Sequence, residues 1–370
     1  MRKSYLDNVR WITVVLVVIY HVLFMYNSIE TDLVIGPFSS VQYQDAFLYL
    51  VYPWFMLLLF VVSGMSSRYY LNNHTGKEYI QSRTRKLLVP STIGLFVFQW
   101  IQGYFSMSIT DAFANIPDVV PAPVLYVIMV LSGQGVLWFA QLLWFFSLLL
   151  PLVRKIEKDK FYNLCGKTNI IVLLLLTIVV FGAAQVLNVP MIIVYRLGIY
   201  GFGFFVGYFV MSHDEVMERL EKYWLPLTIV ACGLGVAFVI VYFGEPYAQH
   251  IILDTPLCNV FAWIAVLAVL AFMKKWGNFE NAFSKWMSKK SWGLYVFHYT
   301  VISACAYYLH KFAPGAPAIV CYLSVALAAF AGSFAIYEII SRIPVVRWCV
   351  LGIKKTKSVN KERSDNHVEG

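Results

Sequence analysis

Two residues near the start of the chain, Arg10 and His21, give the clearest chemical signal in the sequence. They lie eleven positions apart along one long apolar run. An α-helix turns about 100° per residue. Over the eleven residues from Arg10 to His21 it therefore returns to within about 20° of the same face, about 16 Å further along its axis. Asp7 lies one turn before Arg10 and can pair with it. The spacing predicts a cleft that takes an anionic molecule at Arg10 and brings its far end to the His21 imidazole. A topogenic arginine and a histidine that only packs between helices would fit the same spacing.

His298 is the second candidate, because an ionisable group inside an apolar run is costly in a membrane. Ser291, at the start of this run, suits a helix N-cap. Tyr295 and His298 are three positions apart and share a helical face. Taken alone, this pattern favours packing between helices over a catalytic role.

A basic cluster, Arg83, Arg85 and Lys86, precedes Pro90 and the third long apolar run. Three cations at a membrane surface could bind phosphate groups. The general excess of Lys and Arg in the cytoplasmic loops of membrane proteins explains such a cluster equally well.

The elements that would position these residues are membrane helices. Hydrophobic residues make up 60% of the 370-residue chain and charged residues 13%, and the mean hydropathy is +0.68. Soluble domains are roughly half apolar and a quarter charged, so the composition excludes a soluble globular fold. The six cysteines occur singly, without a CxxC pair or a Cys/His cluster, so neither a disulfide framework nor a metal site is predicted.

The sequence predicts an all-α, polytopic membrane protein with about ten transmembrane helices, because each of ten apolar runs has about the 17 to 25 residues that one span needs. Residues 1–352 are expected to form a single membrane-embedded domain, and residues 353–370 a charged, disordered cytoplasmic tail. The short run Val124–Ser132 is interpreted as an interfacial or re-entrant piece. The ten runs are 11–27, 45–65, 87–107, 135–152, 168–187, 190–211, 225–243, 255–273, 292–309 and 318–340.

The positions of the charges predict the orientation. If the N-terminus is cytoplasmic and the spans alternate, all of the 29 Lys and Arg residues except Arg196 and Lys311 fall in cytoplasmic segments. Both termini are then cytoplasmic. The net charge of +9 is explained by topology and by contact with anionic lipid, and not by nucleic-acid binding. The stretch 274–290, with aromatic residues between lysines, is expected to form an amphipathic helix in the cytoplasmic interface.

The chain resembles the acyltransferase 3 family, the integral-membrane O-acyltransferases that act on sugars. The similarity runs in order from Leu6 to about Gly352, and the opening also resembles the glucan-modifying branch of the family. The basic loop departs from the common form, in which two arginines have two residues between them, because Lys86 stands in the second position. The matching segments are Leu6–Trp11 with His21, Phe60–Gly64, Arg83–Pro90, Leu137–Phe139, Ser291–His298 and Tyr337–Pro344.

The resemblance implies an acyltransferase of the bacterial inner membrane that binds no cofactor tightly. Its donor substrate would be cytoplasmic acyl-coenzyme A, of the acetyl or succinyl class, and its acceptor a hydroxyl of a glycan. Phosphates of the donor would meet Arg83, Arg85 and Lys86. His21 would act as general base, or accept the acyl group first and pass it on. Arg10 or His298 would stabilise the developing oxyanion.

Two other classes fit part of the pattern. A multi-pass transporter of a glycan or a small anionic solute would also have ten helices and buried polar residues, but no internal repeat between the halves supports it. A membrane sensor would need an output module, and no cytoplasmic segment suggests one. Thioester cleavage that depends on His21 would separate the enzyme from both alternatives.

Overall fold

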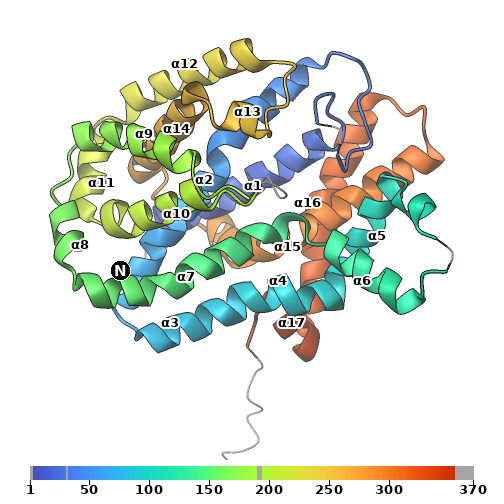
Figure 1. The fold of residues 1–370 in the computed structure, drawn as a ribbon, viewed down its shortest axis with the longest axis horizontal. Helices are drawn as coiled ribbons and strands as arrows, with labels where there is room; N and C mark the ends of the chain where they lie inside the picture. The colour runs from blue at the N-terminus through green and yellow to red at the C-terminus, as the bar shows by residue number, and fades with distance from the viewer. Residues whose placement is uncertain (1–2, 31, 118, 190–193, 355–370) are drawn as a thin grey trace, which may run out of the picture.

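The computed structural model describes residues 3–30, 32–117, 119–189 and 194–354. Within these ranges the chain folds into helices, with no β-strand beyond one isolated bridge (Figure 1). The all-α prediction is therefore confirmed. The predicted disordered tail lies outside the described residues from position 355 onward.

Most helices follow one another through short turns, with longer connections after α1, α5 and α9. In chain order they are α1 (Ser4–Phe24), η1 (Tyr43–Asp45), α2 (Ala46–Leu71), α3 (Gly76–Arg83), η2 (Thr84–Leu88), α4 (Val89–Gly94), η3 (Leu95–Gln99), α5 (Trp100–Ile109), η4 (Ala112–Asn115), α6 (Ala122–Ser132), η5 (Gly135–Leu137), α7 (Trp138–Glu157), α8 (Lys160–Cys165), α9 (Ile170–Ala184), α10 (Leu197–Val206), η6 (Gly207–Met211), α11 (Asp214–Glu221), α12 (Trp224–Tyr242), α13 (His250–Leu253), α14 (Pro256–Trp276), α15 (Ala282–Phe312), α16 (Ala318–Arg342) and α17 (Pro344–Leu351).

Within the part of the chain that the structure describes, six helical segments are long and apolar enough to cross a membrane. The remaining predicted spans coincide with shorter apolar helices, with the interrupted helix from α4 to α5, or with α15, whose first turns carry lysines. The total of ten spans therefore stays a prediction. The six segments are Ser4–Phe24, Tyr43–Leu71, Gly135–Glu157, Trp224–Tyr242, Pro256–Trp276 and Ala318–Arg342.

The helices divide into a buried centre and an apolar rim. In α2 and α14, 67% and 72% of the most apolar window is buried, whereas in α12 and α16 only 17% and 22% is buried. The rim helices α9, α12 and α16 present large aliphatic side chains outward, such as Ile178, Ile240 and Leu327. Such a surface would aggregate in water and is stable against lipid, so the chain is a multi-pass membrane protein.

Helix α1 lies in this centre and contacts α2, α14, α15 and α16. Its first turns are anchored by Asn8, whose amide donates to the carbonyls of Gly277 at 2.7 Å and Phe279 at 2.8 Å. Since α1 is enclosed on several sides, Arg10 and His21 face protein.

The segment from α3 to α5 is one helical path that widens into π-helix twice, at η2 and η3. Pro90 has no amide hydrogen to donate to the Lys86 carbonyl, which favours a widened turn just before it. The basic cluster lies at and just before the first of these π segments. Such π turns are frequent at functional sites.

The predicted amphipathic helix at 274–290 is wrong. Helix α14 continues to Trp276 and ends at Gly277, and α15 begins after Asn281. The Asn281 side chain accepts from the Ser284 amide at 2.8 Å in a capping box, which fixes a new helix start there. The lysines of this stretch therefore belong to the ends of two long helices.

The short run near residue 124 forms α6, which has 11 residues and packs against α5. A Cβ atom at Gly103 would collide with the Met129 carbonyl, so glycine permits the two backbones to touch. At 1.5 Å per residue, α6 is about 16 Å long. This length fits the interpretation as an interfacial or re-entrant piece.

Candidate active site

The two histidines singled out in the sequence meet in the structure. His21 on α1 and His298 on α15 lie with Nδ1 of His21 3.3 Å from Nε2 of His298. Their rings are 5.1 Å apart, centre to centre. His298 is completely buried, whereas His21 is partly buried. Two residues 277 positions apart in the sequence thus form one imidazole pair.

The hydrogen bonds of this pair determine where its protons lie. Nδ1 of His21 is 2.8 Å from the Val17 carbonyl, and Nδ1 of His298 is 2.8 Å from the Tyr295 carbonyl. A carbonyl can only accept, so each Nδ1 carries a hydrogen. In the neutral pair, the one Nδ1–H of His21 is shared between the Val17 carbonyl at 2.8 Å and Nε2 of His298 at 3.3 Å, and Nε2 of His21 is left with a lone pair.

Helix α5 and the π segment before it hold His298 in place. The Gln99 amide donates to the Val296 carbonyl at 3.1 Å and accepts from the Thr300 hydroxyl at 3.2 Å. One turn further, Gln102 donates to Ser303 at 3.1 Å. Both glutamines are buried, so these bonds fix the position of α15 along α5.

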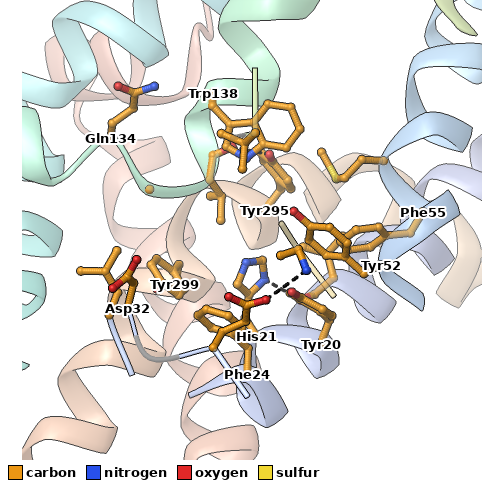
Figure 2. Close-up of a pocket in the computed structure, with 18 of the residues that line it drawn as sticks. Tyr20, His21, Phe24, Asp32, Tyr52, Phe55, Gln134, Trp138, Tyr295 and Tyr299 are labelled. Atoms are coloured by element: carbon orange, nitrogen blue, oxygen red, sulfur yellow. Dashed lines mark hydrogen bonds between the residues drawn. The ribbon is translucent and has the colours of Figure 1, made fainter. Parts of the chain in front are cut away.

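His21 lines a cavity of about 370 Å³, which we call the aromatic cavity. Figure 2 shows the His21 ring among Tyr20, Phe24, Tyr295 and Tyr299, with Tyr52, Phe55 and Trp138 facing the same space. Its charged lining residues are Glu30 and Asp32; no Lys or Arg occurs among the described residues that line it.

Part of the wall of the aromatic cavity is held by contacts that join the loop before α13 to α1 and to the loop after α1. The Tyr20 and Tyr247 hydroxyls are 3.0 Å apart, and the Glu30 carboxylate accepts from the Ala248 amide at 3.0 Å. The loop after α1 and the loop before α13 are thereby joined over the cavity. Both loops contribute to its wall.

A second cavity, of about 580 Å³, adjoins the aromatic cavity at Tyr295 and is called the basic cavity here. It collects all four predicted cations, Arg10, Arg83, Arg85 and Lys86, together with Lys289 and Lys354. No Asp or Glu occurs among the described residues that line it. The arrangement fits a ligand that carries several negative charges.

A neighbouring cavity of about 340 Å³, the serine cavity, shares Arg10, Arg83 and Lys86 with the basic cavity. Its other lining residues are hydroxyl-bearing, namely Ser63, Ser66, Tyr70, Tyr79 and Ser82. Serine and tyrosine hydroxyls beside guanidinium groups are good donors to phosphate oxygens.

Local bonds orient the cations. Arg10 pairs with Asp7 at 2.7 Å, as predicted, and also donates to Ser66. Arg83 donates to Ser67 at 3.1 Å. Burial, followed by the charges of Arg83, Arg85, Arg10 and Lys354, lowers the pKa of Lys86. An anion in the basic cavity would relieve this repulsion between like charges.

Arg10 and His21 do not line one common cleft, as their spacing predicted: Arg10 lines the basic cavity, His21 lines the aromatic cavity, and Tyr295 lies where the two adjoin. Among the described residues, Tyr295 is the one that lines both. Its hydroxyl donates to the Val136 carbonyl, and its ring stacks on Trp292 at 5.7 Å. Arg10 therefore lies with the cations of the basic cavity, and His21 lies beyond this tyrosine.

Sequence reasoning missed the aromatic lining and the role of Tyr295 as a wall. Aromatic residues make up 17% of the chain, so no single one stood out. Glu30 and Asp32 lie in a loop without a recognisable motif. The one available signal was the position of Tyr295, three residues before His298 and on the same helical face.

Comparison with known proteins gives the family. A family model described as an acyltransferase domain, Acyl_transf_3, matches residues 3–338. No curated protein and no solved structure matched the chain. The matched region includes both histidines, the basic cluster and Tyr295, so the predicted resemblance is confirmed. This chain belongs to the acyltransferase 3 family and is a membrane acyltransferase that transfers groups other than aminoacyl groups.

Proposed function

We propose that this acyltransferase moves an acyl group of the acetyl or succinyl class from cytoplasmic acyl-coenzyme A to a hydroxyl of a cell-envelope or exported glycan. The observation that carries the proposal is that a basic cavity and an aromatic cavity adjoin at Tyr295, with His21 of the imidazole pair lining the aromatic cavity. A polyanionic donor fits the first cavity, and a neutral hydroxyl compound fits the second.

The donor side is argued from charge. Coenzyme A carries phosphates at one end and the reactive thioester at the other. Its phosphates would bind Arg83, Arg85 and Lys86, with Arg10 beside them, through charge-assisted hydrogen bonds. Its acyl end would extend along the basic cavity and pass Tyr295, which lines both cavities, to reach His21.

The acceptor side is argued from the aromatic lining. Tyr20, Tyr52 and Trp138 offer flat apolar surfaces against which the C–H faces of a sugar can pack. Glu30 and Asp32 can accept hydrogen bonds from sugar hydroxyls. A glucan would meet these requirements, in line with the resemblance of the opening segment to the glucan-modifying branch.

The chemistry assigned to His21 is general base catalysis. Its Nε2 lone pair takes the proton of the acceptor hydroxyl while the hydroxyl oxygen attacks the thioester carbonyl carbon. The tetrahedral intermediate then breaks its C–S bond, and the departing sulfur takes the proton back from the imidazolium. In the variant mechanism, Nε2 itself attacks the thioester carbonyl carbon, the C–S bond breaks, and coenzyme A leaves as the thiolate. The acceptor hydroxyl then attacks the acyl-histidine, the C–N bond breaks, and the hydroxyl proton passes to the thiolate.

His298 has a positioning role in this scheme. Its Nε2 accepts from His21 and therefore has no proton to offer an oxyanion in the neutral pair. Together with the Val17 carbonyl, it holds His21 in the tautomer whose Nε2 is basic. Arg10 is about 16 Å away along α1, so we assign it to donor binding and no longer to the oxyanion.

We also propose the topology. The basic cavity lies on the side of the first turns of α1, where Arg10 is found, and the aromatic cavity lies on the side of the following loop. Ten spans with both termini cytoplasmic would place the basic cavity toward cytoplasmic donor. The membrane would be the bacterial inner membrane.

The proposal is tested by thiol release from a panel of acyl-coenzyme A donors, with purified protein in nanodiscs and with glycan acceptors added or omitted. Release that depends on the acyl donor and is stimulated by a glycan supports it. Absence of release with every donor would overturn it.

Arg83→Gln is expected to raise the KM for the acyl donor by about 10-fold or more, since a hydrogen bond to a charged group contributes ~1.5–3 kcal/mol. The kcat should change little, because Arg83 lies in the basic and serine cavities, away from His21. Arg219→Gln is the matched control, because Arg219 binds the carbonyls of Gly166 and Thr168 and lines neither cavity. Equal donor KM in wild type and Arg83→Gln would contradict the assignment.

Donor affinity is expected to fall as the pH rises through the lowered pKa of Lys86, below the ordinary lysine value of 10.5. Phosphate binding favours the protonated amine and raises its pKa, so binding takes up a proton in this range. Lys86→Arg should remove the dependence, because a guanidinium stays charged. Donor titrations of wild type and Lys86→Arg across pH 7–10.5 check this. An equal change of donor affinity with pH in the two proteins would exclude Lys86 as the cause of the pH dependence.

One observation also favours a transporter. Two cavities on opposite sides of an aromatic wall would suit a solute carrier that alternates between two open states. Uptake of a labelled glycan by proteoliposomes without thioester cleavage would favour that class. The family assignment favours the enzyme, and so does the tautomer of His21, whose Nε2 carries the lone pair that a general base needs.

A further inference from the structure

A third cavity lies away from the histidine pair, in a groove where α2, α12 and α14 meet. Its volume is about 400 Å³, and its lining is almost entirely apolar. Its lining includes Leu50 of α2, Gly235 of α12, and Phe261, Phe272 and Met273 of α14.

Small residues create this groove. A Cβ atom at Gly235 would lie 3.0 Å from Leu50 Cδ2 and 3.1 Å from Phe261 Cζ, so glycine leaves the space open. Along α14 the groove extends from Phe261 to Met273. At 1.5 Å per residue this is about 18 Å, comparable with half of the ~30 Å hydrocarbon core that one acyl chain occupies.

One end of the groove carries a lysine held among tryptophans. The Lys275 amine lies over the rings of Trp224 at 5.4 Å and Trp276 at 5.6 Å. Trp224 in turn contacts Phe272, at the end of the groove, with ring centres 6.0 Å apart. The exposed Lys275 therefore lies directly beyond the apolar lining.

This combination matches the two parts of an anionic lipid. Tryptophan rings favour the headgroup level of a membrane, and a lysine there attracts anionic headgroups. An apolar groove on the outer surface of a membrane protein is filled by an acyl chain. The neighbouring Lys274 lies over the Tyr5 ring of α1 at 5.5 Å, so Lys275 is the cation that belongs to the groove.

We propose that the α2–α12–α14 groove binds one anionic phospholipid, with an acyl chain along α14 and its phosphate at Lys275. The site is separate from the basic and aromatic cavities and does not rest on the proposed reaction. It would fasten the rim helix α12 to the centre of the molecule, because α12 is otherwise the least buried of the six apolar segments.

The test measures lipid retained by the full-length protein, by native mass spectrometry after titration with phosphatidylglycerol or phosphatidylcholine. Wild type should bind phosphatidylglycerol about 5-fold more tightly than phosphatidylcholine. Lys275→Gln should abolish that preference and still bind both lipids. Lys285→Gln is the matched control, because Lys285 is exposed and pairs with Glu280 at 3.1 Å.

A second variant tests the groove itself. Gly235→Leu fills it and should remove the high-affinity lipid adduct, whereas Gly233→Leu on the same helix should not, because no atom lies within 4 Å of a Cβ there. Circular dichroism and a single size-exclusion peak establish that each variant is folded. Retention of phosphatidylglycerol by folded Gly235→Leu, or an unchanged preference in Lys275→Gln, would overturn the proposal. So would a wild-type dimer that Gly235→Leu dissociates, since a second copy would then occupy the groove.

Discussion

His21→Ala is expected to lower acyl transfer by about 10²–10⁴-fold, the usual contribution of a positioned general base. Donor affinity should stay near the wild-type value, because the cations that bind the donor line a different cavity. Thiol release and acyl transfer to the glycan, measured with saturating donor, give the rate. Direct donor binding, measured separately, gives the affinity.

His74→Ala is the control for His21→Ala. His74 lies on the surface, where its ring stacks on Tyr70 at 4.0 Å, and it lines none of the three cavities described near the histidine pair. Wild-type transfer in folded His21→Ala would exclude a catalytic role for this residue. The family assignment would then require another base in the aromatic cavity.

The two mechanisms for His21 differ in what the donor alone produces. An acyl-histidine predicts a burst of one thiol per protein without acceptor, and an acylated peptide that contains residue 21 after acid quenching. General base catalysis predicts neither, since acyl transfer then requires the hydroxyl. Mass spectrometry of the quenched protein distinguishes them.

Tyr295→Ala is expected to raise hydrolysis of the donor in the absence of acceptor by an order of magnitude, about 10-fold. The side chain lies between the two cavities, so its removal would connect them and admit water to the thioester. Tyr295→Phe keeps the ring but loses the hydrogen bond to Val136, and should give a smaller increase. The ratio of thiol released to glycan acylated measures this uncoupling.

Tyr308→Ala serves as the comparison, because Tyr308 lies on the same helix α15 but is 47% exposed and lines neither cavity. It should keep the wild-type ratio. An unchanged ratio in folded Tyr295→Ala would show that the tyrosine is not a barrier to water. Loss of all thiol release in that variant would instead mean that Tyr295 positions the donor, and would also contradict its role as a wall.

The sequence determined the class of protein, the family and four cations of the site, Arg10, Arg83, Arg85 and Lys86. Apolar composition requires a membrane, since water would not tolerate the exposed faces of α9, α12 and α16. The 3.6-residue period placed Tyr295 and His298 on one helical face. The basic cluster was identified because charge is costly and conspicuous in an apolar chain.

Only the tertiary structure decided which helical faces meet. In a membrane, most helix faces are apolar, so polarity does not specify their partners, and close packing does. At Gly64 a Cβ atom would collide with the Phe204 carbonyl, and at Gly207 with the Val61 carbonyl, so these glycines let α2 approach α10 and η6. Such contacts are not visible in a hydropathy pattern.

The same reason explains the errors in the predicted site. Spacing along α1 placed Arg10 and His21 on one face, but it contained no information about α15, which inserts Tyr295 between their cavities. The pairing of His21 with His298 joins residues 277 positions apart, and it depends on how Gln99 and Gln102 fix α15 against α5. Helix geometry acts locally and is legible in the sequence, whereas contacts between distant helices follow from how the whole bundle packs.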